Sequence, residues 1–313
     1  MKSKTHYTIL LLLSLTITII FSVNLHQQNV ILAKAKSTVN SITVTEGQSI
    51  QEAINEASNG TIIYIEKGIY NEFPINVNKS VTIIGKNIKK TIITGNQASE
   101  ATCLVTITAN DVTIKNLTLT NAEPNEGRAI ILNNVQNVTI ENCNITRCPY
   151  AIELSNSNHS KIIGNNITEN AVCGVRIYKN SQSNKIALNQ ITENTHGISI
   201  DLNCKYNKIC NNNFINNLNN AVGLGLTSNF WNSTYAVGGN YWSNYKGTDT
   251  YSGLNQTMPG SDGIGDIPYP NIPYQNIDYY YMNKNTELQN GSMEQWITMF
   301  LSQLTRQNIK TTT

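Results

Sequence analysis

Charged residues are scarce in this chain: they make up 13% of its 313 residues, against 40% hydrophobic residues. Such a composition is that of a globular protein and excludes a disordered polyelectrolyte. No run of basic residues occurs, and without Lys2, Lys4 and Lys34 near the N-terminus only 19 Lys and Arg face 20 Asp and Glu. We therefore expect no nucleic-acid partner, because nucleic-acid-binding proteins carry a basic patch or stripe.

Cysteine is sparse as well, with six residues and no Cys-x-x-Cys pair. This excludes a dense disulfide scaffold. Cys148 with Cys173, and Cys204 with Cys210, would come near one another in a coiled chain, so disulfides between them are one alternative. Buried thiols are the other alternative, and the one we favour.

Long apolar runs are lacking except near the N-terminus, where Lys2 and Lys4 precede the uncharged run Tyr7–Val23. With the small-x-small sequence Ala33–Ala35 behind it, this pattern predicts a signal peptide over residues 1–35. An uncleaved N-terminal anchor is the alternative, because the run is near the lower limit for a transmembrane helix. Either way we expect the rest of the chain to be extracellular or at the cell surface.

Asparagine, in contrast, is abundant, with 48 residues against 22 Lys and Arg, and an excess this large needs an architectural reason. Ten asparagines lie in Asn-x-Ser/Thr sequons, which predict a glycoprotein in an exported chain, although many sequons arise by chance where Asn and Thr are common. The sequons begin at Asn59, Asn78, Asn116, Asn137, Asn144, Asn158, Asn166, Asn232, Asn255 and Asn290.

The chain repeats itself with a period of 22 to 24 residues. Segments of one pattern begin at Val138, Ser160, Asn184 and Asn207, and a second pattern recurs between them at similar steps. Each period holds two or three short β-branched strands divided by Asn, Gly and Ser, and it is too short for a strand-helix-strand unit. The repeat therefore predicts an all-β parallel β-helix.

Alternation within the strands predicts which side chains point into the core. Three aliphatic ladders are expected inside: Ile130/Leu132, Ile152/Leu154, Val175/Ile177 and Ile198/Ile200; Ile140, Ile162, Ile186 and Ile209; and Ile145, Ile167, Ile191 and Phe214. The expected outward rows are Ile131/Asn133, Glu153/Ser155, Arg176/Tyr178 and Ser199/Asp201. At the bends, asparagine tolerates a left-handed φ, and copies such as Asn170, Asn194 and Asn217 can bond to one another along the axis.

Residues 40–228 are expected to form about seven or eight coils. Within Ser49–Ala57, apolar residues at 50, 53, 54 and 57 predict a helix that caps the N-terminal coil, with Ser49 as its N-cap. Residues 229–282 are expected to form an irregular aromatic C-terminal cap, and residues 283–313 a polar tail. The tail contains Met293–Leu304, whose broad apolar helical face is expected to lie on the rod, on a membrane surface or on a partner.

The opening Thr43–Asn87 resembles the start of right-handed parallel β-helix proteins of the pectin-lyase-like group. GGNYWSNY at Gly238–Tyr245, GSDGIGDIPY at Gly260–Tyr269 and DYYYM at Asp278–Met282 resemble the NosD-type repeat proteins. These are also called carbohydrate-binding and sugar-hydrolysis repeat proteins and are abundant as archaeal surface proteins. The resemblance implies a right-handed solenoid, and for some members a periplasmic copper-binding accessory of nitrous oxide reductase.

Copper fits these residues poorly. Soft copper sites use Cys, Met and His, but beyond the leader region only His159 and His196 remain, and no Met-x-Met or His-x-His spacing occurs. We therefore do not expect a specific copper site.

One patch on the outward rows mixes acidic, basic and aromatic residues: Glu153, Arg176, Tyr178 and Asp201, with His196 just before its strand. In a uronate lyase or epimerase, Arg176 would neutralise the sugar carboxylate while Tyr178 or His196 exchanged the C5 proton. Simple cross-strand pairing of Glu153 with Arg176 is the alternative that we favour. The Asp-Pro-His signature of related epimerases and the three-Asp calcium cluster of pectate-lyase-like enzymes are both missing from the sequence.

The loop from Asp249 to Asp266 is a candidate calcium site. Asp262 and Asp266 flank turn-forming glycines and, with Asp249 and Asp278, offer the hard oxygen ligands that calcium takes. A purely structural turn is the alternative that we favour. The aromatic residues of this region are expected to seal the end of the core rather than to stack on sugars.

Three functions stay open. The leading hypothesis is a non-enzymatic surface protein that binds a glycan or another cell-envelope partner. The others are a polysaccharide lyase or epimerase that acts on uronate polymers, and a NosD-like copper-binding or metal-delivery accessory. Membrane contact is expected only through the N-terminal segment or the C-terminal amphipathic helix.

Overall fold

The computed structural model describes Ser22 and residues 40–272, with gaps at 96–102, 123, 234–237, 268 and 270–271. Contacts divide the chain into two units, Met1–Asn40 and Ser41–Thr313, and the β-structure belongs to the second. The expected signal peptide, apart from Ser22, and the expected tail at 283–313 lie outside the described residues. Within the described ranges, no helix has the length and apolar character needed to cross a membrane.

The β-structure consists of three parallel sheets, here called A, B and C, and a small antiparallel pair. Sheet A contains β1 (Ser41–Val44), β2 (Ile62–Ile65), β5 (Thr82–Gly85), β8 (Thr113–Lys115), β11 (Thr139–Glu141), β14 (Lys161–Ile163), β17 (Lys185–Ala187) and β20 (Lys208–Cys210). Sheet B contains β3 (Gly68–Tyr70), β6 (Thr91–Thr94), β9 (Thr118–Thr120), β12 (Asn144–Thr146), β15 (Asn166–Thr168), β18 (Gln190–Thr192), β21 (Asn213–Ile215) and β23 (Tyr241–Trp242). Sheet C contains β4 (Ile75–Val77), β7 (Cys103–Ile107), β10 (Arg128–Asn133), β13 (Tyr150–Ser155), β16 (Cys173–Tyr178), β19 (His196–Ile200) and β22 (Asn219–Val222). The antiparallel pair is β24 (Tyr251–Ser252) with β25 (Met258–Pro259).

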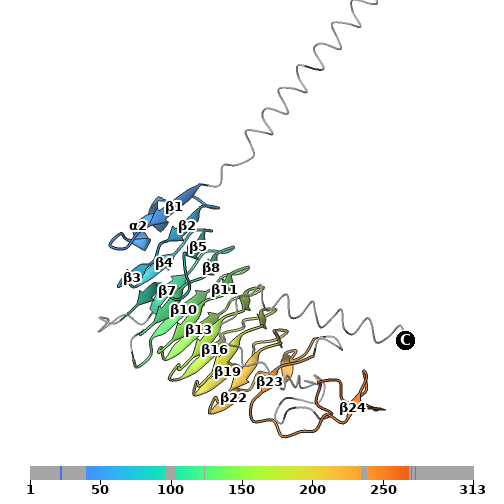
Figure 1. The fold of residues 1–313 in the computed structure, drawn as a ribbon. Helices are drawn as coiled ribbons and strands as arrows, with labels where there is room; N and C mark the ends of the chain where they lie inside the picture. Colours follow the sequence, from blue (N-terminus) through green and yellow to red (C-terminus); the bar gives the residue numbers. More distant parts are fainter. Residues whose placement is uncertain are drawn as a thin grey trace, which may run out of the picture. The chain divides into compact units, whose positions relative to one another are not determined.

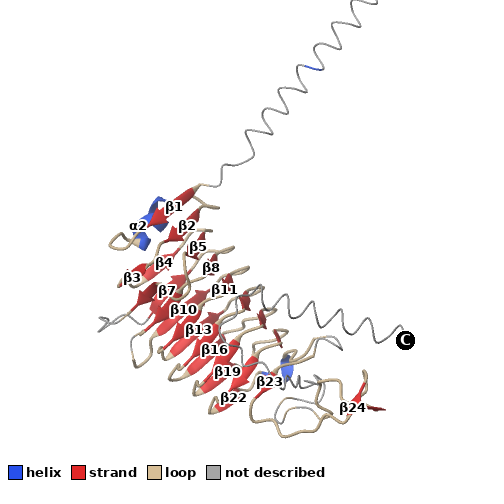
Figure 2. Cartoon of the chain, in the orientation of Figure 1, coloured by secondary structure: helices blue, strands red, loops and turns tan. Residues whose placement is uncertain are grey.

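Each strand pairs in parallel with the strand one coil later in the same sheet (Figure 1). Ile140 of β11, for example, pairs with Ile114 of β8 and with Ile162 of β14. Between residues 40 and 272 the described helices are only α2 (Ile50–Glu56) and the 3-10 turn η1 (Leu226–Ser228) (Figure 2). The prediction of an all-β right-handed parallel β-helix with about eight coils is confirmed.

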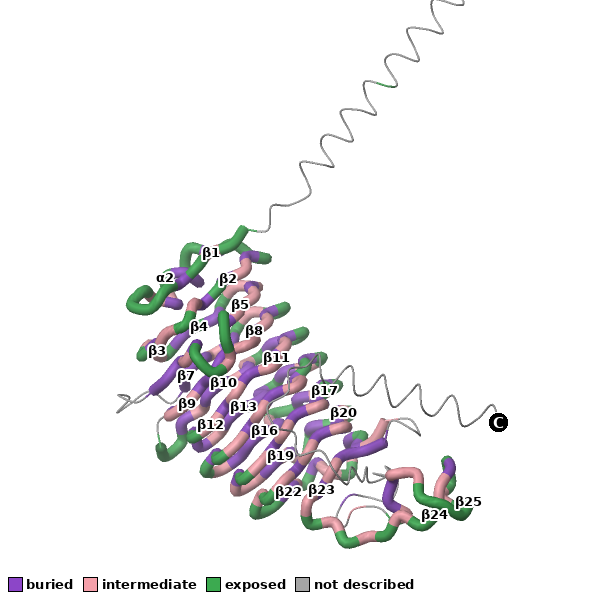
Figure 3. The backbone as a smooth tube through the Cα atoms, in the orientation of Figure 1, coloured by how far each residue is buried: buried purple, intermediate pink, exposed green. Residues whose placement is uncertain are grey.

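The core of the solenoid consists of side-chain ladders that run from coil to coil. Figure 3 shows buried positions along the strands of successive coils. Every member of the three predicted aliphatic ladders is fully buried, from Ile130 to Phe214. Fully burying one aliphatic side chain of this size contributes about 1.5 to 3 kcal/mol. The ladders are therefore the main source of stability, and the inward set predicted from alternation is confirmed.

The bend after sheet B repeats one backbone conformation in successive coils. Asn121, Arg147, Glu169, Glu193 and Asn216 all have φ between 51° and 56°. Asparagine enters this left-handed region more easily than most residues, which confirms one predicted reason for its abundance. The charged residues adopt the same conformation at a cost of about 1 to 2 kcal/mol each, because the coils on either side impose the bend.

Asparagine has a second role inside the solenoid, where inward-pointing asparagine side chains bond to one another from coil to coil. The Nδ2 group of Asn170 donates to Oδ1 of Asn194 at 2.9 Å, and Asn194 donates likewise to Asn217 at 3.0 Å. The predicted axial bonding is thus confirmed, although these residues lie beside the left-handed position and not at it. Two further ladders were not predicted: Asn165–Asn189–Asn212–Asn240 and Asn184–Asn207–Asn229.

Helix α2 covers the N-terminal end of the core. It buries three of the four predicted apolar positions, namely Ile50, Ala53 and Ile54, and the fourth, Ala57, is its buried C-cap. The hydroxyl of Ser49 accepts a hydrogen bond from the backbone N–H of Glu52 at 3.0 Å, which confirms the predicted N-cap. Glu72, on a later segment, also accepts from the N–H of Ile50 at 2.6 Å, a contribution that no local pattern indicates.

Aromatic rings close the C-terminal end of the core. Trp242 stacks on Phe214, with ring centroids 4.4 Å apart, and Tyr269 stacks on Trp242 at 4.2 Å. Trp242 and Trp231 are both fully buried. These rings therefore seal the solenoid, as predicted for the irregular aromatic cap.

All six cysteines are buried, and none of them forms a disulfide. Burial raises the pKa of the Cys143, Cys148 and Cys173 thiols to about 12, so they stay protonated at neutral pH. The structure thus agrees with the favoured prediction of buried thiols.

Candidate functional site

The mixed polar patch lies on the outward face of sheet C, over β10, β13, β16 and β19. The strand register pairs Glu153 of β13 with Ile131 of β10 on one side and with Arg176 of β16 on the other. Tyr178 stands two residues beyond Arg176 on the same strand and therefore on the same face. The register also carries Asp201 to the position beside Tyr178, so the structure brings together four of the five residues predicted for this site.

Glu153 is the centre of the patch, and only 4% of its side chain is exposed. Its Oε2 atom accepts a hydrogen bond from Nε of Arg128 at 3.0 Å and another from Nη1 of Arg176 at 3.4 Å. Glu153 therefore occupies the predicted outward row, but the carboxylate is not open to solvent because two guanidinium groups cover it. A carboxylate held in this way cannot take a proton from a substrate without losing both ion pairs.

Two tyrosine rings support the cations of the patch. The guanidinium carbons of Arg128 and Arg176 lie 5.2 and 5.4 Å from the centroid of the Tyr150 ring. The Tyr178 ring has Arg176 at 4.2 Å and Nζ of Lys179 at 5.3 Å. Contacts of this kind contribute about 0.5 to 1 kcal/mol each at exposed sites. Tyr178, a predicted proton-exchange residue, thus lies against two cations.

Of the other two predicted residues, His196 lies apart from this centre and Asp201 lies at its edge. His196, the first residue of β19, pairs in register with Cys173, three positions before Arg176 and so about 10 Å away along the strand. Its Nδ1 atom lies 3.4 Å from Nδ2 of Asn219. Asp201 directly follows Ile200, the partner of Ile177 in the register, and therefore lies beside Tyr178. The described geometry therefore does not assemble His196 and Arg176 into one reaction centre.

Arg128 and Tyr150 belong to the patch but were not predicted from the sequence. They begin β10 and β13 and are paired in the register. A signal was available, because each directly precedes the aliphatic part of its repeat, at Ala129 and Ala151. Both residues thus hold the same place in consecutive coils.

The loop predicted as a calcium site ties its carboxylates to its own backbone. All three described carboxylates accept hydrogen bonds from backbone N–H groups at 2.8 to 3.2 Å: Asp249 from Asp262 and Gly263, Asp262 from Gly253 and Ile264, and Asp266 from Thr250 and Tyr251. Asp278, the fourth predicted ligand, lies outside the described residues. In the part of the chain that the structure describes, no three His, Cys, Asp or Glu residues gather where they could hold a metal ion. The bonds seen are those of a structural turn, and calcium binding stays a prediction.

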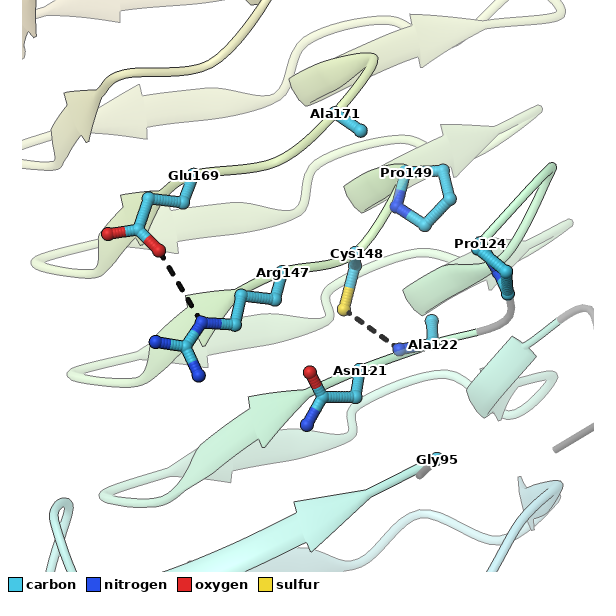
Figure 4. A pocket seen from close by; sticks show the side chains of 9 residues that line it. All are labelled: Gly95, Asn121, Ala122, Pro124, Arg147, Cys148, Pro149, Glu169 and Ala171. Carbon is cyan, nitrogen blue, oxygen red and sulfur yellow. Dashed lines mark hydrogen bonds and ion pairs between the residues drawn. The ribbon is translucent and has the colours of Figure 1, made fainter. Parts of the chain in front are cut away.

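A pocket of about 420 Å³ opens at the bend after sheet B (Figure 4). Arg147 and Glu169 stand at its edge, with Nε and Oε2 3.5 Å apart, and the ring of Pro149 lines another part. The sulfur of Cys148 accepts a hydrogen bond from the N–H of Ala122 in its wall. More than half of each charged side chain is exposed, so this ion pair is solvated and differs from the covered pairs of Glu153.

A copper site would need Cys, Met or His donors among the same described residues. All six cysteines are buried, and burial raises the pKa of Cys143, Cys148 and Cys173 to about 12, whereas the thiolate is the form that ligates metals. His159 is exposed on a bend with φ of 54°, His196 lies against Asn219, and Met258 is 58% exposed. The described residues therefore do not fit a copper site.

Comparison with solved structures gave several distant likenesses. ORF18 of Geobacillus virus E2 matches with a TM-score of 0.48 and 16% identity, over 70% of this chain and 50% of that chain. The catalytic domain of a GH87 alpha-1,3-glucanase in complex with tetrasaccharides has a TM-score of 0.45 and 18% identity, over 70% and 50%. Pectate lyase Pel9A has a TM-score of 0.47 and 11% identity, over 72% and 75%. This chain spans about half the length of the first two proteins, and the likenesses carry no argument about function. A comparison with curated protein sequences gave no significant match.

Comparison with family models gave a match over most of the chain. The family described as "Periplasmic copper-binding protein (NosD)" matches residues 19–247, a range that includes the polar patch and the GGNYWSNY motif. The description names a periplasmic protein, which is an exported location and agrees in that respect with the predicted leader. The chain therefore belongs to the NosD family of right-handed parallel β-helix proteins.

Proposed function

We propose that this protein is an exported, non-enzymatic β-helix protein that binds a glycan of the cell envelope along the outward face of sheet C. The observation that carries the proposal is the state of Glu153, which is enclosed between Arg128 and Arg176. The patch is thereby fixed in one arrangement that suits binding and does not suit proton transfer. Parallel strands about 4.8 Å apart also present regular outward rows, which an extended polymer can follow.

The chemistry of the patch supports a sugar ligand. Tyrosine rings and planar guanidinium groups offer flat faces for sugar rings, and their polar atoms can bond hydroxyl groups. The family description places such proteins in the periplasm, a compartment in contact with envelope glycans.

A uronate lyase or epimerase is the second candidate, because Arg176 lies 4.2 Å from the ring of Tyr178 and the pair could hold a carboxylate beside a phenol. This reaction would need a proton acceptor and donor at the sugar C5 atom. His196 could serve only after a movement of β19 relative to β16, since the register places it three positions from Arg176.

The test is a glycan array probed with the purified exported chain, followed by incubation of every bound polymer with the protein. We expect binding without change in the polymer. Unsaturated products that absorb in the ultraviolet, or altered sugar NMR signals, would establish the enzyme instead if Arg176→Ala abolished them. A blank array, with no envelope component recovered by crosslinking, would overturn the proposed function.

A further inference from the structure

We propose that Arg128 and Arg176 form one anion-binding subsite on sheet C and that the glycan recognised there carries carboxylates, as uronate polymers do. This inference rests on the proposed function and adds to it the charge of the ligand and the residues that read it.

Both arginines keep donors that the fold does not use. Arg128 donates from Nε to Glu153 and from Nη1 to the backbone carbonyl of Glu126 at 2.7 Å, and its Nη2 group has no partner among the described residues. Arg176 donates only from Nη1, so its Nε and Nη2 groups also have no partner among the described residues. Adjacent guanidinium N–H groups form the paired, parallel hydrogen bonds that a carboxylate accepts.

The exposure of the arginines suits a binding role. Their side chains are 19% and 24% exposed, so a ligand can reach them while most of the surrounding water is excluded. A hydrogen bond to an ion is stronger in such a partly desolvated place than on an open surface. The exposed Arg147, whose side chain is 68% exposed, lacks this property.

The charge balance of the patch favours an anion. At its centre two cations, Arg128 and Arg176, share the single covered carboxylate of Glu153. Glu153 compensates one of these two charges and leaves an excess of one at the centre of the patch. At the edge of the patch, Lys179 over the Tyr178 ring is a further cation, while Glu126 before β10 and Asp201 beside Tyr178 are two acidic residues.

The subsite is also organised before any ligand arrives. Glu153 and the Tyr150 ring hold both guanidinium groups in place, so little side-chain freedom is lost on binding. The Tyr178 ring, 4.2 Å from Arg176, adds an apolar surface beside the donors. A carboxylate attached to a sugar ring can use both features, whereas a free phosphate ion can use only the donors.

The first test compares two forms of one polymer. Binding of the full exported chain to polygalacturonate and to its fully methyl-esterified form is measured by calorimetry at one salt concentration, with dextran and dextran sulfate alongside. We expect at least about tenfold tighter binding of the free acid, because hydrogen bonds to charged groups are the stronger ones. Equal binding of the acid and the ester would overturn the subsite and leave the proposed glycan function standing. Dextran sulfate bound as tightly as polygalacturonate would overturn the assignment to carboxylates. Failure of every glycan, here and on the array, would overturn both proposals.

The second test uses matched variants. Arg128→Gln and Arg176→Gln are each expected to weaken polygalacturonate binding about tenfold. Arg147→Gln is the control: it removes the same charge at the bend after sheet B, outside the patch, and should leave binding unchanged. Arg176→Gln leaves Glu153 paired with Arg128, so this variant should fold, which circular dichroism and a melting curve verify. Arg176→Lys keeps the charge but loses the planar fork, and it should also bind more weakly. A folded Arg176→Gln that binds like the parent, or an equal loss in Arg147→Gln, would overturn the subsite.

Discussion

A single carboxylate determines how the polar patch on sheet C is arranged. Burying an ion costs several kcal/mol, and well-packed apolar residues of similar volume often serve stability as well as a buried ion pair does. The pairing of Glu153 with two arginines is therefore poorly explained by stability alone. What the pairing does provide is a fixed position for both guanidinium groups, 3.0 and 3.4 Å from one oxygen atom.

We expect Glu153→Gln to lower the free energy of unfolding by about 1 to 3 kcal/mol, because a neutral amide cannot balance Arg128 and Arg176. Glu169→Gln is the matched control: Glu169 is 51% exposed and its pair with Arg147 is solvated, so the change should stay within about 0.5 kcal/mol. Urea unfolding of both variants measures the difference. Equal midpoints would contradict the role given to Glu153.

The buried thiols should make stability depend on alkaline pH. Burial raises the pKa of Cys143, Cys148 and Cys173 to about 12, whereas the ordinary value is 9.0. Between these pH values the unfolded chain loses thiol protons that the folded chain keeps. The free energy of unfolding therefore falls as pH rises from about 9 towards 12, by at most about 1.4 kcal/mol per pH unit for each thiol. Below pH 9 both states keep the thiol protons, so the stabilisation by the buried thiols is fully present there.

Urea unfolding under reducing conditions at pH 8 and pH 10 measures this dependence. Cys143→Ala should make the free energy of unfolding fall less steeply with pH, since the variant lacks one of the three thiols. If the free energy of unfolding fell equally steeply with pH in the parent and in that variant, groups other than Cys143 would cause the pH dependence.

At the scale of the element, the asparagine ladders join coils that side-chain packing alone would let slide. Asn212 shows the pattern: its Nδ2 group donates to Oδ1 of Asn240 and to the backbone carbonyl of Ile186, both at 2.9 Å. Its Oδ1 atom accepts from the backbone N–H and the Nδ2 group of Asn189. The Asn212 side chain thus satisfies two buried backbone groups of the preceding coil, the carbonyl of Ile186 and the N–H of Asn189.

Asn212 and Asn213 offer a comparison between neighbours. We expect Asn212→Ala to lower the free energy of unfolding by about 2 to 4 kcal/mol, because the variant leaves buried backbone groups without partners. Asn213 is half-buried on the outer face of β21, and Asn213→Ala should cost less than about 0.5 kcal/mol. Urea unfolding of the pair tests this, and similar losses in both would show that the ladder adds nothing specific.

The acidic loop of the C-terminal cap is expected to hold together through its own hydrogen bonds. Asp266→Ala should increase hydrogen exchange at Thr250 and Tyr251, because their N–H groups bond to this carboxylate at 2.8 and 3.0 Å. Exchange at the same amides in the parent protein should not change when EDTA is added. Faster exchange with EDTA would contradict the structural turn and establish the calcium site predicted from Asp249, Asp262, Asp266 and Asp278.

At the scale of the whole molecule, one charge in a ladder should disturb every neighbouring coil. We expect Ile162→Asp to prevent folding, because Ile162 is fully buried and an unpaired buried charge costs several kcal/mol against a total stability of about 5 to 15 kcal/mol. Lys161→Asp, on the exposed position before it, should give a folded protein. A normal melting curve for Ile162→Asp would contradict the assigned core.

The sequence was sufficient to predict the solenoid, because the repeat period and the alternation of aliphatic residues recur in every coil. It predicted the burial of Ile162 and the bonding of Asn170, but not the ladder through Asn165, since polar residues among polar neighbours show no alternation. The sequence also did not predict that two arginines cover the carboxylate of Glu153. Alternation indicates which side of a sheet a residue occupies, whereas its exposure depends on side chains from two other coils.

The asparagine ladders have one direction: in all three, each bond between the side chains of two ladder residues runs from an Nδ2 group to the Oδ1 atom of the next coil towards the C-terminus. A duplicated coil would therefore offer its neighbours the same acceptor and the same donor as the coil it copies. Gene duplication could lengthen the rod by one strand spacing, about 4.8 Å, without altering either cap. An insertion of one residue within a strand would instead turn aliphatic side chains outward. Evolution of this protein can thus change the length of the outward face of sheet C in whole coils.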